Sequence, residues 1–486
     1  MTGWESITLR VQTPMFLQGQ PGHAGEPGKA EVRPSAIRGL VRFWLRAVVG
    51  SVVGDDLDRV AQVESAILGS TTSPSKVQFR VPHQPRTAPL TATTVHDFEK
   101  LSQIDISTGY DPVDRPLGGF AGAAYLMGQG LYPLRTDRPR AFIEPDQTLD
   151  VLVRSRLSPA ESFLFRAALQ LALNLDGLGA RSHRGFGSVV VERSDVKALT
   201  ALRPNDVQKC IDIFTKAAPQ LVWEVLGATQ EPPKPGNSFP TLSNMSVHLS
   251  AGPVPPSNGM GLPPSNDWRT ALSEVGLRWR LFRANRIESD AVWNPDRYDR
   301  ERRADGRYDY TPPVKSAEWL EVLGRSWPTR PNEPPSHFPL AVLGLPIVFK
   351  KGNPDGTGVK QVDAVIGSRN EKSARRRWPS PLRFRLIPDT TVGSSGPPAQ
   401  RLLTVGFAVD FLPPVGDEQP QLVYSVGNRP LKVEVGDLQT TLSEWTQYVD
   451  ASRSELSPRS APTPPTPPPT SASRAAFFNR IRGAGS

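Results

Sequence analysis

Proline is the feature that most constrains how this chain can fold. The 486 residues include 51 prolines, roughly twice the usual proportion. Proline lacks a backbone N–H and fixes φ, so it interrupts helices and is excluded from the interior of sheets. We therefore expect modest regular elements joined by long irregular connections. The length also exceeds what one hydrophobic core usually organises, which predicts two or three domains.

Charge and cysteine content narrow the class of protein. The chain carries 57 Lys and Arg against 48 Asp and Glu, a formal net charge of +9, and this balance favours a polyanionic partner. Cys210 is the only cysteine, so neither an intrachain disulfide nor a cysteine-based zinc site can form. Because no long apolar run or export signal is present, we expect a cytoplasmic protein without a membrane segment.

Alternating strands and helices are predicted in the first half. Ile7, Leu9 and Val11 alternate with polar residues, and Ser158 with Glu161 forms a capping-box signature. The expected elements are strand Ser6 to Gln12, helix Pro34 to Val49, strand Leu149 to Arg156, helix Ser158 to Asn174 and strand Ser188 to Arg193. This order, with a glycine-rich loop before the last strand, is typical of an elaborated ferredoxin-like or RRM-like unit.

The second half shows a similar but weaker pattern. Strands are expected there at 340–349, 382–386, 402–411 and 431–435, and a helix at 438–449, while a helix at 205–217 is expected to follow the last strand of the first half. The fold class predicted is α+β, with two ferredoxin-like domains that carry long loop-rich insertions. The predicted domains are 1–230 with an insertion at about 82–147 and a glycine-rich loop at 177–187, a proline-rich connection at 231–267, a second domain at 268–455 with an irregular insertion, and a flexible proline-rich tail at 456–486.

Three arginines on the first predicted helix form a basic stripe. Arg38, Arg42 and Arg46 lie four residues apart, so they share one helix face. Ile37, Val41, Trp44 and Val48 then face inward, and we expect Arg38 and Arg42 to point outward. Such a stripe suits the phosphates of a polynucleotide, because like charges at this spacing repel unless an anion or an acidic partner is present. The alternative is a basic face that is merely solvated.

The glycine-rich loop is a second candidate for binding phosphates. Four glycines, Gly177, Gly179, Gly185 and Gly187, flank Arg181, His183 and Arg184. Glycines permit positive φ and let backbone N–H groups approach an anion, while the basic side chains supply further donors. The alternative is a tight helix-to-strand turn that needs glycine for its geometry alone. The dinucleotide-binding fingerprint does not fit, because the spacing fails after Gly179 and a strand follows.

A third basic patch contains an aromatic residue. Arg375, Arg376 and Arg377 precede Trp378, whose ring could stack on a base or sugar. Alternatively, Trp378 packs beneath Pro379 and the arginines face an acidic neighbouring subunit.

Enzymatic chemistry has few candidates in this sequence. His96-Asp97 resembles the doublet of metal-dependent phosphohydrolases, but the five other histidines are scattered, which gives no ligand set for a metal. A better rival is metal-free RNA cleavage, with His183 as general acid or base and Arg181 or Arg184 stabilising the phosphorane. A third possibility is a structural subunit that touches only proteins. We expect no catalytic residue, no metal ligand and no cofactor.

Four segments resemble the RAMP superfamily, and within it the first-subunit family of type III-B CRISPR (Cmr) effector complexes. They are Thr13 to Gly19 with Glu31 to Ala47, the loop Gly177 to Val189, Leu343 to Ile347, and Arg375 to Leu382, where Trp378-Pro379 departs from the family's shorter spacing. The resemblance implies a non-catalytic subunit that contacts the 3′ region of a guide RNA or its complementary target RNA, beside other Cmr subunits. The RNA-binding residues predicted are Arg33, Arg38, Arg42, Arg46, Gly179, Arg181, His183, Arg184, Gly185, Arg375, Arg376 and Trp378.

Overall fold

The structure of the protein is a computed structural model. It describes residues 3–19, 28–91, 94, 122–128, 131, 140–203, 206–252, 254, 268–285, 342–344, 347–350, 359–366, 374–376, 378–388, 399–412, 421–424, 429–430 and 438–450. Within these residues no helix combines the length and the apolar character needed to cross a membrane.

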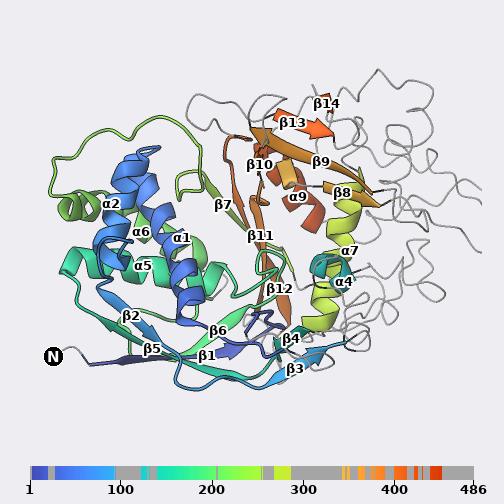
Figure 1. Ribbon diagram of the computed structural model, residues 1–486, viewed down its shortest axis with the longest axis horizontal. Coiled ribbons are helices and arrows are strands. Elements are labelled where there is room, and N and C mark those ends of the chain that lie inside the picture. Colours follow the sequence, from blue (N-terminus) through green and yellow to red (C-terminus); the bar gives the residue numbers. More distant parts are fainter. Residues whose placement is uncertain are drawn as a thin grey trace, which may run out of the picture.

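A four-stranded antiparallel sheet forms the base of the first unit (Figure 1). Its strands are β1 (Glu5–Val11), β2 (Val77–Arg80), β5 (Thr148–Ser155) and β6 (Val189–Ser194), in the order β2-β5-β1-β6. Helix α1 (Pro34–Val53) follows β1, and α5 (Pro159–Leu175) follows β5. The element order is therefore that of a βαββαβ ferredoxin-like unit. The five elements expected in this part are present within one or two residues at most boundaries, whereas strand β2 and the helix at 57–68 were not expected.

Local signals explain where these helices begin and end. Ser158 accepts from the backbone N–H of Glu161 at 3.3 Å, and the Glu161 carboxylate accepts from the Ser158 N–H at 2.9 Å, so the predicted capping box is present. Helix α1 begins at Pro34 and stops before Gly54, whose φ of 65° favours glycine. The alternation of buried Ile7, Leu9 and Val11 on β1 also holds.

Two further helices pack on this layer. Helix α2 (Leu57–Leu68) is capped by Asp56, which accepts from the Arg59 N–H at 3.2 Å. Helix α6 (Val207–Leu226) runs nine residues beyond its expected end at 217 and passes through Pro219. Burial of Ala218, Val222 and Trp223 compensates for the backbone hydrogen bond that a proline removes.

The predicted insertion at 82–147 contains small elements. Strands β3 (Thr87–Leu90) and β4 (Arg140–Ile143) pair antiparallel, and α4 (Gly122–Met127) lies between them in sequence. Met15 bridges to Ile143, so this hairpin is tied to the loop that follows β1. The expectation of small strands in the insertion is confirmed.

A second unit is built on the three-stranded sheet β11-β12-β7. Its elements are β7 (Met245–Leu249), α7 (Trp268–Asn285), β11 (Leu382–Pro388), β12 (Gln400–Phe407) and α9 (Leu438–Asp450). Strand β7 lies inside the expected proline-rich connection, so that expectation is wrong at this point. The partner of β7 is β12, which lies about 150 residues further along the chain, and local composition cannot reveal such a pairing.

The remaining strands form a separate sheet. Strand β9 (Val359–Ile366) pairs with β8 (Ile347–Lys350), β10 (Ala374–Arg376) and β13 (Gln421–Tyr424), and β13 pairs with β14 (Arg429–Pro430). The expected strand at 340–349 corresponds to β8 with a later start. The expected strand at 431–435 lies outside the described residues.

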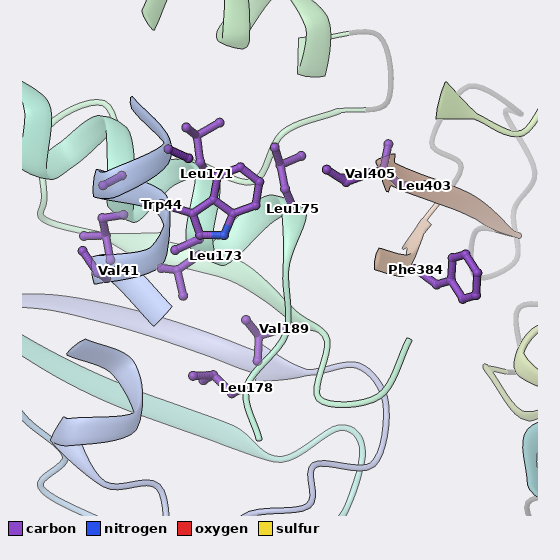
Figure 2. Packing of buried hydrophobic residues seen from close by; sticks show 14 of the residues in the cluster. Val41, Trp44, Leu171, Leu173, Leu175, Leu178, Val189, Phe384, Leu403 and Val405 are labelled. Carbon is purple, nitrogen blue, oxygen red and sulfur yellow. The ribbon is translucent and has the colours of Figure 1, made fainter. Parts of the chain in front are cut away.

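One continuous hydrophobic core joins the two units (Figure 2). Trp44 of α1 lies among leucines of α5, and Leu403 and Val405 of β12 approach from the other side. The Phe43 and Trp44 rings lie 5.8 and 6.1 Å from the ring of Phe407. The helices of the first unit therefore pack on the sheet of the second as well as on their own.

Two buried arginines of β11 reach across the contact between the units. Arg383 forms an ion pair with Asp176, the residue that caps the end of α5, and its guanidinium lies 3.8 Å from the centre of the Phe43 ring. Arg385 donates to the backbone carbonyls of Asp176 and Val189. Burial lowers the pKa of each guanidinium to about 9. Both nevertheless stay cationic at neutral pH, so each needs the oxygen partners that the first unit provides.

We predict that Asp176→Ala lowers the stability of the whole chain by about 3 to 5 kcal/mol, because it leaves a buried guanidinium without a counter-charge. Chemical denaturation measures this loss. The control is Asp146→Ala, which removes the exposed pair between Asp146 and Arg10 and should cost less than about 1 kcal/mol. Equal effects of the two substitutions would contradict the assignment.

Candidate nucleic-acid interface

The arginine stripe of α1 is divided between the protein interior and the surface. Arg42 donates to the carbonyls of Leu68 and Gly69 at 3.1 and 2.7 Å, which are groups left unpaired at the end of α2. Arg46 pairs with Glu64 through both carboxylate oxygens, with Nη2 at 3.1 Å from Oε1. Arg42 is half-buried and Glu64 is buried, so α2 neutralises two thirds of the stripe.

This arrangement corrects one expectation and keeps another. Arg42 does not point outward, because α2 covers it; the sequence pattern of α1 alone gives no sign of this neighbour. Inward packing of Ile37, Val41, Trp44 and Val48 is confirmed. Arg38 lies one turn nearer the start of α1, where it is half-buried and its Nε has no hydrogen-bond partner among the described residues.

Arg33 stands at the N-terminal end of the same helix. Its Nη2 donates to the Gln18 carbonyl at 2.8 Å, and its Nε lies 3.6 Å from the Glu31 carboxylate. Half of the side chain is exposed, at 50%. The hydrogen bond to Gln18 ties the helix start to the segment that follows β1, while the charge remains accessible.

The glycines of the 177–187 loop are enclosed by the protein itself. A Cβ at Gly179 would lie 2.6 Å from the Phe16 carbonyl oxygen, and one at Gly185 would lie 2.6 Å from the Leu272 side chain. Both have positive φ, 96° and 86°. The structure thus gives these two glycines a packing role, which is the alternative reading of the loop; RNA contact by them stays a prediction.

Several backbone N–H groups of the loop also have internal partners. Ala180 donates to Phe16 at 2.8 Å, Gly187 donates to Pro14 at 2.9 Å, and Ser188 donates to the Thr13 hydroxyl at 3.0 Å. The threonine-proline segment after β1 therefore holds the loop in place. An open cradle of N–H groups is not what this geometry provides.

His183 and Arg184 lie at the contact with the second unit. The His183 carbonyl accepts from the Phe384 N–H at 3.2 Å, and the Arg184 guanidinium lies 4.7 Å from the centre of the Trp279 ring. Burial, with a smaller contribution from the charge of Arg184, lowers the pKa of the His183 imidazole to about 4. The ring is therefore neutral at pH 7, and the Arg184 charge is used in stacking on an aromatic ring.

Arg181 is the exposed basic residue of the loop. Its backbone has a φ of 65°, which is costly for a residue with a side chain. Its guanidinium lies against Gly128, and enclosure of part of the side chain lowers its pKa. The neighbouring Ala180 pairs with Phe16, and Arg33 is bonded to Gln18. Arg33 is therefore bonded to the segment 16–18, and Arg181 follows a residue that pairs with it.

The third predicted patch divides in the structure. Arg375 and Arg376 lie on β10, opposite Val365 and Ala364 of β9, and Arg377 lies outside the described residues. Trp378 is buried, with its ring 5.4 Å from that of Phe411 and its Nε1 donating to the Val342 carbonyl at 3.2 Å. The expectation that Trp378 stacks on a base is corrected: its ring has a place in the core.

The buried arginines Arg383 and Arg385 were not predicted. The only signal for them is the alternation Leu-Arg-Phe-Arg-Leu at 382–386, which suggests an amphipathic strand with one wet face. The described residues contain no group of three or more His, Cys, Asp or Glu side chains placed to hold a metal ion. The doublet His96-Asp97 lies outside them.

We predict that Arg42→Glu destabilises the protein, because it places a carboxylate against the carbonyl end of α2 and beside Glu64. Thermal unfolding should show a midpoint lowered by several degrees. Arg38→Glu is the matched control on the same helix face and should leave the midpoint nearly unchanged. A similar drop for both variants would mean that α2 does not hold Arg42 as described.

Comparison with known proteins adds an independent finding. Residues 8–190 match the RAMP superfamily. The chain is 28% identical over 225 residues to the CRISPR system Cmr subunit Cmr1-1 of Pyrococcus furiosus. The aligned region covers 45% of this chain and 59% of that protein. It is 26% identical over 192 residues to the CRISPR system Cmr subunit Cmr1-2 of the same organism, and this alignment covers 38% of this chain and 92% of that protein.

Solved structures were also compared. The crystal structure of Cmr1 from Pyrococcus furiosus in its apo form aligns over 91% of this chain and 96% of that chain, with 16% identity and a TM-score of 0.43. The sequence match ends near the last strand of the first unit, at residue 190. Residues 8–190 therefore match the RAMP superfamily, and the chain is similar in sequence to the Cmr1 subunits of Pyrococcus furiosus.

Proposed function

We propose that this protein is a non-catalytic, RNA-binding structural subunit of a cytoplasmic type III-B CRISPR (Cmr) ribonucleoprotein. In this role it contacts the 3′ region of the guide RNA, the complementary target RNA, or both, and docks beside other Cmr subunits. The Cmr1 relatives support membership of the complex, and the net charge of +9 supports a polyanionic partner.

The observation that carries the RNA-binding proposal is that Arg33 and Arg181 are exposed and Arg38 is half-buried, and that none of the three is held by a buried carboxylate among the described residues. Arg42 and Arg46 are bound to groups of α2 and Arg184 lies against Trp279, although the Arg46 side chain is also 54% exposed. Arg181 also holds its position in spite of an unfavourable φ. Strained residues of this kind cluster at binding sites, and a guanidinium is well suited to phosphate.

We extend the proposal to the architecture. The second unit has five elements, β7, α7, β11, β12 and α9, in the order βαββα. This order supports a second ferredoxin-like domain, of which the described residues contain every element except the last strand. The proposed domains remain 1–230 and 268–455, although β7 contributes to the second domain from within the connection 231–267.

The rival function is metal-free cleavage of guide RNA by His183. The arrangement gives this little support: burial and the charge of Arg184 lower the pKa of the His183 imidazole to about 4, so at pH 7 the ring is not the imidazolium that a general acid requires, and it is a weak base. Purified protein incubated with labelled guide RNA should bind without cutting. A cleavage product that disappears on His183→Ala would favour the nuclease.

We predict that Arg33→Glu, Arg38→Glu and Arg181→Glu combined weaken RNA binding at least tenfold and make the dependence of affinity on salt less steep, because each lost phosphate contact lowers that slope by about one. Fluorescence anisotropy with labelled RNA across a salt series measures both. The control reverses two exposed lysines of α6, Lys209→Glu and Lys216→Glu. Equal losses of RNA affinity in both variants would mean that net charge alone is responsible. Unchanged affinity in the arginine variant would mean that Arg33, Arg38 and Arg181 do not contact RNA.

We further predict that Arg181→Gly separates binding from stability. Glycine relieves the cost of the positive φ, so the unfolding midpoint should stay level or rise while RNA affinity falls. Ala198→Gly is the matched control, because Ala198 has a φ of 66° and is exposed; it should gain the same relief without affecting RNA. If Arg181→Gly binds RNA as tightly as the original protein, Arg181 is only a turn residue.

A further inference from the structure

The four-stranded sheet of the first unit has two unlike faces. Val77, Leu149, Val151 and Val153 point toward the helices and are buried, as are Ile7 and Leu9. Figure 1 shows α1, α2, α5 and α6 on this one side of the sheet, with the start of β1 at the edge of the molecule. Among the described residues no helix covers the other face, and apart from the buried Thr8 the side chains there are half-buried or exposed.

An aromatic side chain marks one corner of this open face. Trp4, just before β1, is half-buried, and the guanidinium of Arg154 on β5 lies 4.9 Å from the centre of its ring. Arg80 on β2 approaches the same ring at 5.3 Å. Arg154 also donates to the side-chain amide oxygen Oε1 of Gln78 at 2.6 Å. Three strands thus place two cations and one indole together; we call Trp4, Gln78, Arg80 and Arg154 the Trp4 corner.

The charges of the Trp4 corner are not balanced by acids. Neither Arg80 nor Arg154 has a carboxylate within 4 Å among the described residues, and Arg156, two positions after Arg154, is exposed and also lacks one there. The acids of this face lie elsewhere: Asp146 and Glu192 pair with Arg10, and Asp150 accepts from Thr8 at 2.8 Å. Asp195 accepts from the Ser6 N–H at 3.1 Å. The corner is therefore locally cationic.

This combination suits an unpaired nucleotide better than other anions. Stacking of a base on an aromatic ring, beside guanidiniums that meet the flanking phosphates, is how proteins hold single-stranded nucleic acid without reading its sequence. A free phosphate would not need the indole. An acidic peptide would not need the flat face of the indole. A base that takes the place of a guanidinium over the indole leaves that guanidinium beside the flanking phosphate.

We propose that the Trp4 corner is a second RNA contact, at which one unpaired base stacks on Trp4 while Arg80 and Arg154 bind the adjacent phosphates. This inference rests on the proposed function, and it lies on the opposite side of the sheet from α1. It predicts a path for single-stranded RNA across the open face of the first sheet, in addition to the surface of Arg33, Arg38 and Arg181.

The test compares Trp4→Ala with the original full-length protein, using labelled single-stranded RNA and a matched oligonucleotide with an abasic tract. Loss of one stacked base corresponds to about 1 to 3 kcal/mol, so affinity for intact RNA should fall roughly 5- to 150-fold, with Trp4→Phe recovering part of it. Binding of the abasic oligonucleotide should not change. Arg80→Glu with Arg154→Glu should weaken both ligands.

The outcomes separate this inference from the proposed function. If the original protein binds no RNA, the proposed function fails and the inference fails with it. If RNA binding depends on Arg33, Arg38 and Arg181 but Trp4→Ala matches the Lys209→Glu, Lys216→Glu control, only the Trp4 corner is overturned. Photocrosslinking of thiouridine RNA to the peptide containing Trp4 would support the contact without relying on a variant that must fold. If Trp4→Ala instead loses a protein partner while its RNA affinity is unchanged, the Trp4 corner is a protein contact and the inference is refuted.

Discussion

The buried contact between Arg383 and Asp176 determines how the two units are arranged. Arg383 comes from the middle of β11, and Asp176 ends α5 immediately before the glycine-rich loop. A buried cation must find its counter-charge at one place, whereas the apolar contacts around it could slide. Arg385 adds two carbonyl acceptors at Asp176 and Val189. These bonds fix both ends of the loop against β11, so the loop's shape depends on the second unit.

The same contact decides which basic residues remain for a partner. With the loop held against β11, Arg184 stacks on Trp279 and His183 is enclosed, while Arg181 faces outward. In the same way, Arg42 and Arg46 bind groups at the end and on the face of α2, whereas Arg38 and Arg33 do not. The protein thus uses about half of its motif arginines to build the scaffold that presents the others. The basic motifs of this protein are in part structural motifs.

How far the sequence could predict the fold follows from the range of each interaction. The capping box at Ser158, Pro34 at the start of α1 and the alternation along β1 are local, and they located most elements of the first unit within a residue or two. Strand β7 was missed because its partner lies far along the chain. The burial of Trp378 was missed for the same reason, since Val342 and Phe411 come from distant segments.

The sequence by itself determined the α+β character, the order of elements in the first unit, the family resemblance and the identity of the basic residues. Only the tertiary structure decided which of those residues face solvent. A helix pattern shows that Arg38, Arg42 and Arg46 share a face, but not that α2 contacts two of them. No sequence pattern indicated that Trp4, Arg80 and Arg154, which come from three separate segments, meet. Side-chain availability depends on neighbours brought in by folding, and spacing along one element carries no information about them.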